Sequence, residues 1–265
     1  MASRRTFSKA QGARWKLETE YIPMTNTTPQ RLYLMQLGTA IIPTAQGPLA
    51  LSSGCYLVQT SDGKNILIDS GLPADYTPPS GAPLVAKEKN VLEHLADLGL
   101  RPDDINLLIC THFDVDHAGY HDSFASAELI VQRTHYELAR SGYARFAAVR
   151  PHWDHPALHY RLIDGDTELL PRLSLIESSG HAPGHQSVLV HLPKTGPVLL
   201  AIDAVSFQRQ FTPDRKAQPV EDEEQLRAST RKLLDLVARE HVALVIFGHD
   251  GQQWQTLKKA PDFYE

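Results

Sequence analysis

The sequence predicts an α/β protein in which helices cover the outer faces of β-sheets, and two observations support this prediction. Apolar runs of strand length recur along the chain, and amphipathic helical segments lie between them. Because the two kinds of segment alternate, a layered arrangement is favoured over separate helical and β domains. The chain has 265 residues, which suits a single layered domain.

The strands are predicted from apolar runs bounded by turn residues. A hairpin is expected over 53–71, because the turn sequence TSDGK separates two apolar runs. The other expected strands are 31–43, 104–110, 127–132, 173–178, 186–192, 197–203 and 242–250.

Three helices are predicted, at 89–100, 133–142 and 222–241. In the first, Val91, Leu92, Leu95 and Leu98 have the spacing of an amphipathic helix. Gly99 and Gly142 are placed to end the first and second helices.

The composition excludes several classes of protein. A net charge of -5 argues against non-specific binding to nucleic acid, which needs a positive surface. No apolar run reaches the length of a transmembrane helix, so no membrane contact is expected. The two cysteines, Cys55 and Cys110, lie in apolar stretches and are interpreted as reduced core thiols.

The N-terminal stretch SRRTFSKA resembles the start of a twin-arginine export signal, but the apolar segment that should follow is missing. We therefore interpret residues 1–30 as an N-terminal arm on a cytoplasmic protein, with one domain over 31–265. An arm that docks on a second subunit is compatible with the sequence, so a homodimer is left open.

The most informative stretch is HFDVDH, in which His112, Asp114, Asp116 and His117 follow an apolar strand directly. Ionisable groups at the end of a buried strand are costly unless they are compensated. Imidazole and carboxylate together suit divalent metal ions. The alternative is that the histidines cap the next helix and the aspartates are solvated.

Other ligand-type residues also end apolar runs. His181 and His185 lie in a Gly/Pro loop between two strands, Asp203 ends a third run, and His249 ends the last one. Each is weak evidence alone, because a single histidine at a strand end is more often structural. If these strand ends meet at one edge of the fold, they form one site.

The set HFDVDH, GHAPGHQS, AIDA and FGHD, in this order, resembles the metallo-β-lactamase fold superfamily. The stretch GCYLVQTSDGKNILIDSGLP and the ending LKKAPDFYE resemble its N-acyl homoserine lactonase branch. The resemblance covers about residues 31–265. It implies a metallo-β-lactamase-like hydrolase domain, an αββα sandwich with a dinuclear metal site on one edge, that opens the lactone ring of N-acyl homoserine lactones, the small-molecule signals of quorum sensing.

The resemblance also implies a set of ligands for two divalent metal ions. The first metal is assigned to His112, Asp114 and His185, the second to Asp116, His117 and His249, and Asp203 bridges both. His181 and Asp69 fall outside this set. We expect His181 to be a hydrogen-bonded loop residue near the site, and Asp69 to brace the metal loop.

Two positions depart from the family pattern. The usual motif is His-x-His-x-Asp-His, and Asp114 stands where its second histidine would be. A carboxylate there favours manganese or iron relative to zinc, which is otherwise the first choice; flavodiiron proteins of the superfamily carry a glutamate at this position. Alternatively, Asp114 reaches the metal only through water.

The second departure follows the bridging aspartate. Lactonases of this branch commonly carry a tyrosine three residues after it, and here that position is Ser206, followed by Phe207. Both are assigned to substrate binding, and Tyr120 and Tyr160 are further candidates for the missing hydroxyl.

The mechanism that the resemblance implies is attack of a metal-bridging hydroxide on the lactone carbonyl, with Asp116 carrying a proton to the leaving alkoxide. A hydrolase of another lactone or ester is a second hypothesis. A di-iron redox protein and a degenerate, non-catalytic module are further alternatives.

The stretch 145–162 contains three histidines, a tryptophan and a tyrosine. We favour a half-exposed connector, because no strand is recognised beside it. The alternatives are a helix with His155 and His159 on one face, and a pocket wall formed by Phe146, Trp153 and Leu158.

Overall fold

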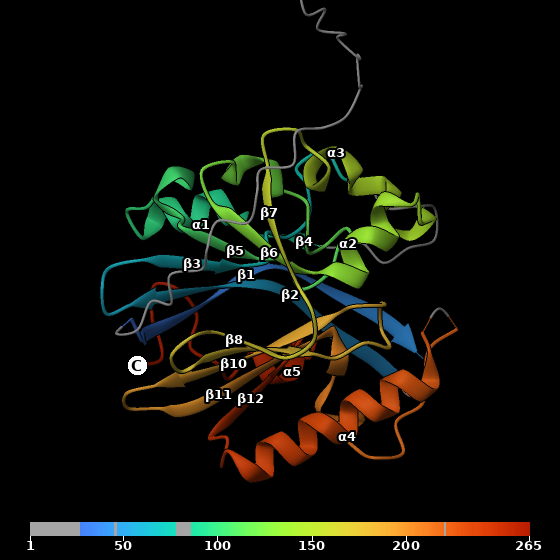
Figure 1. The fold of residues 1–265 in the computed structure, drawn as a ribbon. Helices are drawn as coiled ribbons and strands as arrows, with labels where there is room; N and C mark the ends of the chain where they lie inside the picture. The colour runs from blue at the N-terminus through green and yellow to red at the C-terminus, as the bar shows by residue number, and fades with distance from the viewer. Residues whose placement is uncertain (1–26, 45–46, 78–85, 220) are drawn as a thin grey trace, which may run out of the picture.

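The computed structural model describes residues 27–44, 47–77, 86–219 and 221–265. Two β-sheets lie face to face, with α1, α2 and α3 over one sheet and α4 over the other (Figure 1). The prediction of an αββα sandwich is therefore confirmed. None of the helices in the described ranges is both long and apolar enough to cross a membrane.

The larger sheet has seven strands in the order β4-β1-β2-β3-β5-β6-β7. Its strands are β1 (Pro29–Thr44), β2 (Gly47–Thr60), β3 (Asn65–Ile68), β4 (Ala86–Lys87), β5 (Leu107–Ile109), β6 (Glu128–Gln132) and β7 (His159–Ile163). The expected hairpin is β2 and β3, which pair antiparallel. β3, β5, β6 and β7 run parallel to one another, so their carboxyl ends meet at one edge of the sheet.

The smaller sheet has five strands in the order β12-β11-β10-β9-β8. They are β8 (Thr167–Leu170), β9 (Leu173–Glu177), β10 (Gln186–Leu192), β11 (Gly196–Ile202) and β12 (Leu244–Phe247). β11 and β12 are parallel, and the other pairs are antiparallel.

The helices are α1 (Val91–Asp97), α2 (Arg133–Arg140), α3 (Arg150–Trp153), α4 (Glu223–Arg239) and α5 (Gly251–Trp254), with short 3-10 turns between some elements. Asn90 begins α1 with a capping box, in which its side chain accepts from the backbone of Glu93 and the Glu93 side chain accepts from the backbone of Asn90. Asp222 caps α4 by accepting from the backbone N–H of Gln225 at 3.0 Å.

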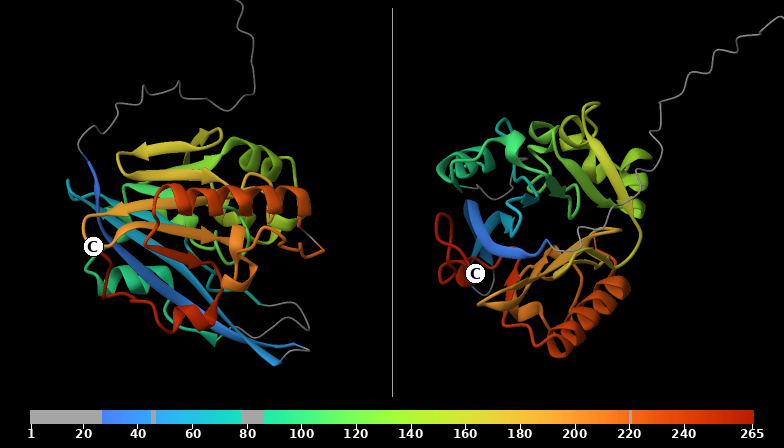
Figure 2. Two further views of the ribbon diagram at one scale, coloured as in Figure 1. Left: turned by 90° about the horizontal axis from the view of Figure 1, so that it is seen from below. Right: turned by 60° about the vertical axis from the view of Figure 1, so that its left-hand side comes forward.

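Three hydrophobic clusters correspond to the three contacts between the four layers. One lies between the sheets and joins residues such as Leu34 and Ile68 to Val188 and Leu200. A second packs the larger sheet against its helices, and a third packs Leu199 and Ala201 of β11 against Leu233 and Leu236 of α4. The two views of Figure 2 show α4 lying along the smaller sheet.

The structure corrects the interpretation of residues 145–162. β7 begins at His159 and pairs with β6, so a strand does lie in this stretch, whereas His155 lies before the strand and outside any helix. Apolar and polar residues do not alternate clearly along β7, because it is an edge strand with mostly half-buried residues. The prediction of one helix face shared by His155 and His159 is wrong.

The first strand begins close to the predicted end of the N-terminal arm. β1 begins at Pro29, two residues before the expected domain start, and Thr27 is already buried. Residues 1–26 lie outside the described residues, so the arm itself stays a prediction.

Candidate metal centre

The loop after β5 carries the motif histidines and aspartates to the edge between the two sheets. The backbone N–H and side chain of Thr111 donate to Asp69, at 2.8 and 2.7 Å, which fixes the start of the loop. The backbone N–H of His117 then donates to the carbonyl of Asp114 at 3.0 Å and closes a tight turn. This turn brings His112 and His117 together, with ring centroids 4.0 Å apart.

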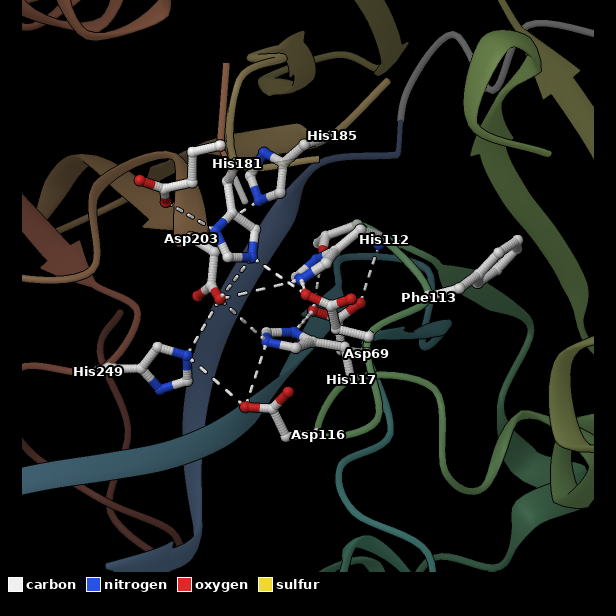
Figure 3. Close-up of polar contacts among 12 residues, drawn as sticks. Asp69, His112, Phe113, Asp116, His117, His181, His185, Asp203 and His249 are labelled. Atoms are coloured by element: carbon white, nitrogen blue, oxygen red, sulfur yellow. Dashed lines mark hydrogen bonds and ion pairs between the residues drawn. The ribbon is translucent and has the colours of Figure 1, made fainter. Parts of the chain in front are cut away.

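Asp203, just beyond β11, is the centre of the cluster. Its Oδ2 atom lies 3.0 Å from Nε2 of His249, 3.3 Å from that of His181, 3.6 Å from that of His117 and 3.8 Å from that of His112. The backbone N–H of Asp203 donates to Nε2 of His185 at 3.3 Å. Figure 3 shows these rings directed at the Asp203 carboxylate from loops that are far apart in sequence.

The other ring nitrogen of each histidine has a hydrogen-bond partner away from Asp203. Nδ1 contacts Thr111 Oγ1 in His112 (3.0 Å), Asp69 Oδ2 in His117 (2.8 Å) and Ser178 Oγ in His185 (2.9 Å). In His249 it donates to the carbonyl of Ser52 (3.0 Å), and in His181 to Glu221 Oε1 (3.0 Å). Such partners fix the ring and leave Nε2 for a metal ion.

Burial and the charges of the cluster shift the pKa values of its members in opposite directions. Burial lowers the pKa of His112 and His185 well below the usual value. Burial also disfavours charge on His249 and His181, but carboxylates led by Asp203 outweigh it and raise the pKa of each to about 9. Burial opposes ionisation of Asp203, yet the surrounding histidines hold its pKa well below the usual range.

Asp114 has a partner that the sequence did not reveal. Arg145 binds both of its carboxylate oxygens, with Nε 2.7 Å from Oδ1 and Nη2 2.5 Å from Oδ2. Burial would raise the pKa of Asp114, but His112, His181 and Arg145 hold it well below its usual value. Arg145 comes from a 3-10 turn 31 residues away, so no local pattern could indicate it.

The donor set fits divalent cations. Nε2 of His112, Nε2 of His117 and Oδ1 of Asp203 are buried without a hydrogen-bond partner among the described residues. Burying polar atoms unpaired is costly, so the two unpaired imidazole nitrogens, each within 3.8 Å of Asp203 Oδ2, point to a bound cation. Ligand atoms lie within 4.8 Å of one another in three groups, namely His112-Asp114-His181, His112-His117-Asp203 and Asp116-His117-His249.

Six of the seven predicted ligands belong to these groups, and His185 is beside them rather than in them. His181, which we placed outside the ligand set, lies inside one group. Asp69 occupies the bracing position expected for it, since it is fully buried and bonded to His117 and Thr111.

A cavity of about 550 Å³ opens beside the cluster. Asp114, Asp116, His181, Asp203 and His249 form its polar floor, and both Ser206 and Phe207 lie in its wall. Its apolar wall consists of Ala40, Ile42, Leu49, Leu51, Leu72 and Val115. An apolar wall with a polar floor is typical of a pocket for a small organic ligand.

The tyrosine that lines this cavity is Tyr76, which sequence reasoning missed, and Tyr120 and Tyr160 do not line it. The Tyr160 hydroxyl instead donates to the carbonyl of Trp153 at 2.6 Å.

The alternative of a pocket wall at Phe146, Trp153 and Leu158 is also wrong. Phe146 and Trp153 are fully buried in the cluster beneath the helices of the larger sheet, and Leu158 packs against that cluster. Phe113 stacks on Trp153 at 4.9 Å. These aromatic residues support the metal loop from behind.

The fold and this centre define the class of protein. The chain matches the metallo-beta-lactamase superfamily over residues 50–249, and it belongs to that family.

Two similar proteins share the name of one branch of that superfamily. An N-acyl homoserine lactonase of Bacillus thuringiensis is 31% identical over 257 residues, covering 89% of this chain and 99% of the relative. The N-acyl homoserine lactonase AttM of Rhizobium radiobacter is 30% identical over 266 residues, with the same coverage.

Solved structures agree with this relationship. An N-acyl homoserine lactone hydrolase with the product N-hexanoyl-L-homoserine at its catalytic metal centre has a TM-score of 0.78 and 30% identity, covering 89% of this chain and all of the other. AidC, a dizinc quorum-quenching lactonase, has a TM-score of 0.65 at 16% identity and supports the fold alone.

Proposed function

We propose that this protein is a metal-dependent lactonase that opens the ring of N-acyl homoserine lactones, with zinc as its resident metal. One observation carries the proposal: ligand-type side chains from three separate loops converge on Asp203, which lies in a fourth, at the floor of a cavity with apolar walls. The lactonases to which the chain is similar align over 89% of its length, and the family match over residues 50–249 includes all of these loops.

The family pattern assigns the first cation to His112, His185 and position 114, and the second to Asp116, His117 and His249, with Asp203 shared. When bound, a pair of divalent cations supplies Lewis acidity and lowers the pKa of water to about 7. The chain itself contributes fixed ligands, because each imidazole is oriented by a partner on Nδ1.

Asp116 is the residue we assign to proton transfer. Its side chain is 28% exposed and lines the cavity, and its Oδ2 lies 3.6 Å from His249 Nε2 and 3.8 Å from His117 Nε2. A carboxylate at the boundary between ligand cluster and cavity can carry a proton to the alkoxide that forms when the ring opens.

The apolar wall is assigned to the acyl chain. Ile42 and Leu49 pair across β1 and β2, and Leu51 lies on β2 next to the cluster. Phe207 extends this wall, while Ser206 and Tyr76 offer hydroxyl groups for the lactone or amide oxygens.

A hydrolase of another lactone or ester is the second candidate, favoured by the serine at position 206 in the cavity wall. To separate the two, hydrolysis would be assayed on short- and long-chain N-acyl homoserine lactones and on simple lactones without an amide. We expect the acylated substrates to be preferred. Faster hydrolysis of the simple lactones would favour the second candidate.

The cytoplasmic location and the homodimer stay predictions. Sedimentation of the full chain and of a chain that starts at Thr27 would test whether the N-terminal arm contributes to assembly.

A further inference from the structure

His181 has the same arrangement as the four predicted histidine ligands. Its Nδ1 lies 3.0 Å from Glu221 Oε1, and Glu221 in turn lies 3.6 Å from the buried Arg215. Its Nε2 lies 3.3 Å from Asp203 Oδ2. With Nδ1–H donating to a carboxylate, Nε2 is the nitrogen that points into the cluster and would give up its proton to a bound cation. This geometry is that of a metal ligand.

The position of the ring also fits. His181 lies with its centroid 5.1 Å from that of His112 and 6.1 Å from that of His185, while His112 and His185 are 5.0 Å apart. The three rings are thus neighbours beside Asp203, and the backbone N–H of Asp203 donates to Nε2 of His185, which lies outside the ligand groups. Nε2 of His181 and Nε2 of His112 share a ligand group with Asp114, which is separate from the group of Asp116, His117 and His249.

Arg145 accounts for the aspartate at position 114. It holds the Asp114 carboxylate at both oxygens, and the two side chains are only 18% and 17% exposed. A bidentate ion pair of this kind uses one lone pair on each oxygen and cancels the charge of the carboxylate. Oδ2 also lies 3.1 Å from Nε2 of His181 and 3.3 Å from that of His112. The extra negative charge of an aspartate in place of a histidine is therefore balanced within the chain.

The same arginine positions His181. Nη1 of Arg145 donates to the backbone carbonyl of His181 at 2.6 Å, and Nη2 lies 2.7 Å from His181 Nε2. The second contact occupies the lone pair that a bound cation would take, so metal binding would exchange one partner for the other.

We propose that His181 supplies the first metal with the imidazole that the family pattern places at position 114, and that Arg145 holds Asp114 off the metal. The inference rests on the proposed function only in requiring a dinuclear centre. Its consequence is a first site with three imidazoles, from His112, His181 and His185, which favours zinc rather than manganese or iron.

The test compares zinc binding by the wild-type protein with binding by His181→Ala, Asp114→Asn and His155→Ala. His155 is exposed and remote from the described cluster, so His155→Ala is the matched control. Zinc content is measured by plasma mass spectrometry, and affinity by competition with a chelator. Far-ultraviolet circular dichroism verifies that each variant is folded.

We expect two zinc ions per chain in the wild type, in His155→Ala and in Asp114→Asn. In His181→Ala the affinity for one ion should fall by about a hundredfold or more, beyond the usual effect of a bracing residue. Two ions held by His181→Ala with unchanged affinity, together with the loss of one ion from Asp114→Asn, would overturn the assignment.

A second readout needs no variant. In the cobalt-substituted wild-type protein, each coordinated imidazole with a protonated Nδ1 gives one exchangeable, paramagnetically shifted proton resonance. The proposal predicts five such resonances, from His112, His117, His181, His185 and His249. Four resonances, all retained in His181→Ala, would contradict it.

Hydrolysis of a long-chain N-acyl homoserine lactone is measured on the same wild-type sample. Two zinc ions and five imidazole resonances without hydrolysis would refute the proposed function and leave the assignment of His181 intact. Hydrolysis with only four imidazole resonances would support the proposed function and refute the assignment of His181.

Discussion

Asp69 and His117 are joined by a hydrogen bond of 2.8 Å between Oδ2 and Nδ1, across 48 residues of sequence. The same carboxylate receives two hydrogen bonds from Thr111, and the backbone of Asp69 has a φ of 59°, unusual for a residue other than glycine. Asp69 therefore fixes both the start of the metal loop and one of its histidines.

Replacing Asp69 with Asn should weaken metal binding, because the amide holds His117 less firmly. We expect affinity for the ion at His117 to fall by about 10- to 100-fold, with the fold retained. Zinc competition measures it, and Asp97→Asn, on the exposed surface, is the matched control. Equal affinity in the two variants would show that Asp69 does not brace the site.

Replacing Asp203 with Asn should remove most activity, because this carboxylate is the shared centre of the ligand cluster. We expect turnover to fall by at least about a hundredfold, as when a main electrostatic contribution is lost. Turnover and metal content are measured on the same sample. Unchanged values for both would rule out a bridging role.

Gly248 permits the close approach of Asp203. A Cβ atom at this position would lie 2.4 Å from Asp203 Oδ1 and 2.7 Å from the carbonyl oxygen of Ile202. Gly248→Ala should therefore displace the carboxylate. Metal content and turnover should fall, while the melting temperature changes little. A folded variant with two metals and full turnover would contradict this.

His135 connects the loop after β5 to the loop that carries His181 and His185, and it should make the stability of the fold depend on pH. Its Nε2 accepts from the backbone N–H of Phe113 at 2.9 Å, and its Nδ1 donates to the carbonyl of Pro183 at 2.7 Å. Burial lowers its pKa from 6.5 to about 4. Between these values the unfolded chain binds a proton that the folded chain does not, so the free energy of unfolding falls as pH falls.

His135→Gln keeps one donor and one acceptor but does not titrate. Compared with the wild type by urea unfolding between about pH 7 and pH 5, it should lose less stability on acidification. An identical pH dependence of the two proteins would show that His135 titrates normally in the folded state.

The wall at Leu51 should set acyl-chain preference. Leu51→Ala removes apolar contact from the cavity, so KM for a long-chain substrate should rise by roughly tenfold, with little change in kcat. Short-chain substrates should be affected less. Ile41→Ala, at a neighbouring side chain that is 68% exposed and outside this cavity, is the control. An equal rise of this KM in both variants would show that the acyl chain binds outside this wall.

Local patterns in the sequence predicted much of the fold. The turn TSDGK, the amphipathic spacing of α1 and the apolar runs before Asp69, His112, Asp203 and His249 all correspond to elements of the structure. β7 and β8 were missed, because a short edge strand has neither a continuous apolar run nor strict alternation.

The candidate ligand residues could be recognised because each follows an apolar strand, whereas their partners could not. Arg145, Glu221 and Tyr76 reach the site from turns and loops, and only the three-dimensional fold brings them there. Phe146 and Trp153 have the composition of a ligand pocket but belong to the core, since composition does not indicate which layer an aromatic residue faces.

The most direct test of the central claim is the metal content of wild-type protein purified without added metal, with N-acyl homoserine lactone hydrolysis assayed on the same sample. The account predicts two divalent ions per chain, and hydrolysis that a chelator abolishes and zinc restores. One ion or none, with no hydrolysis after zinc is added, would contradict it.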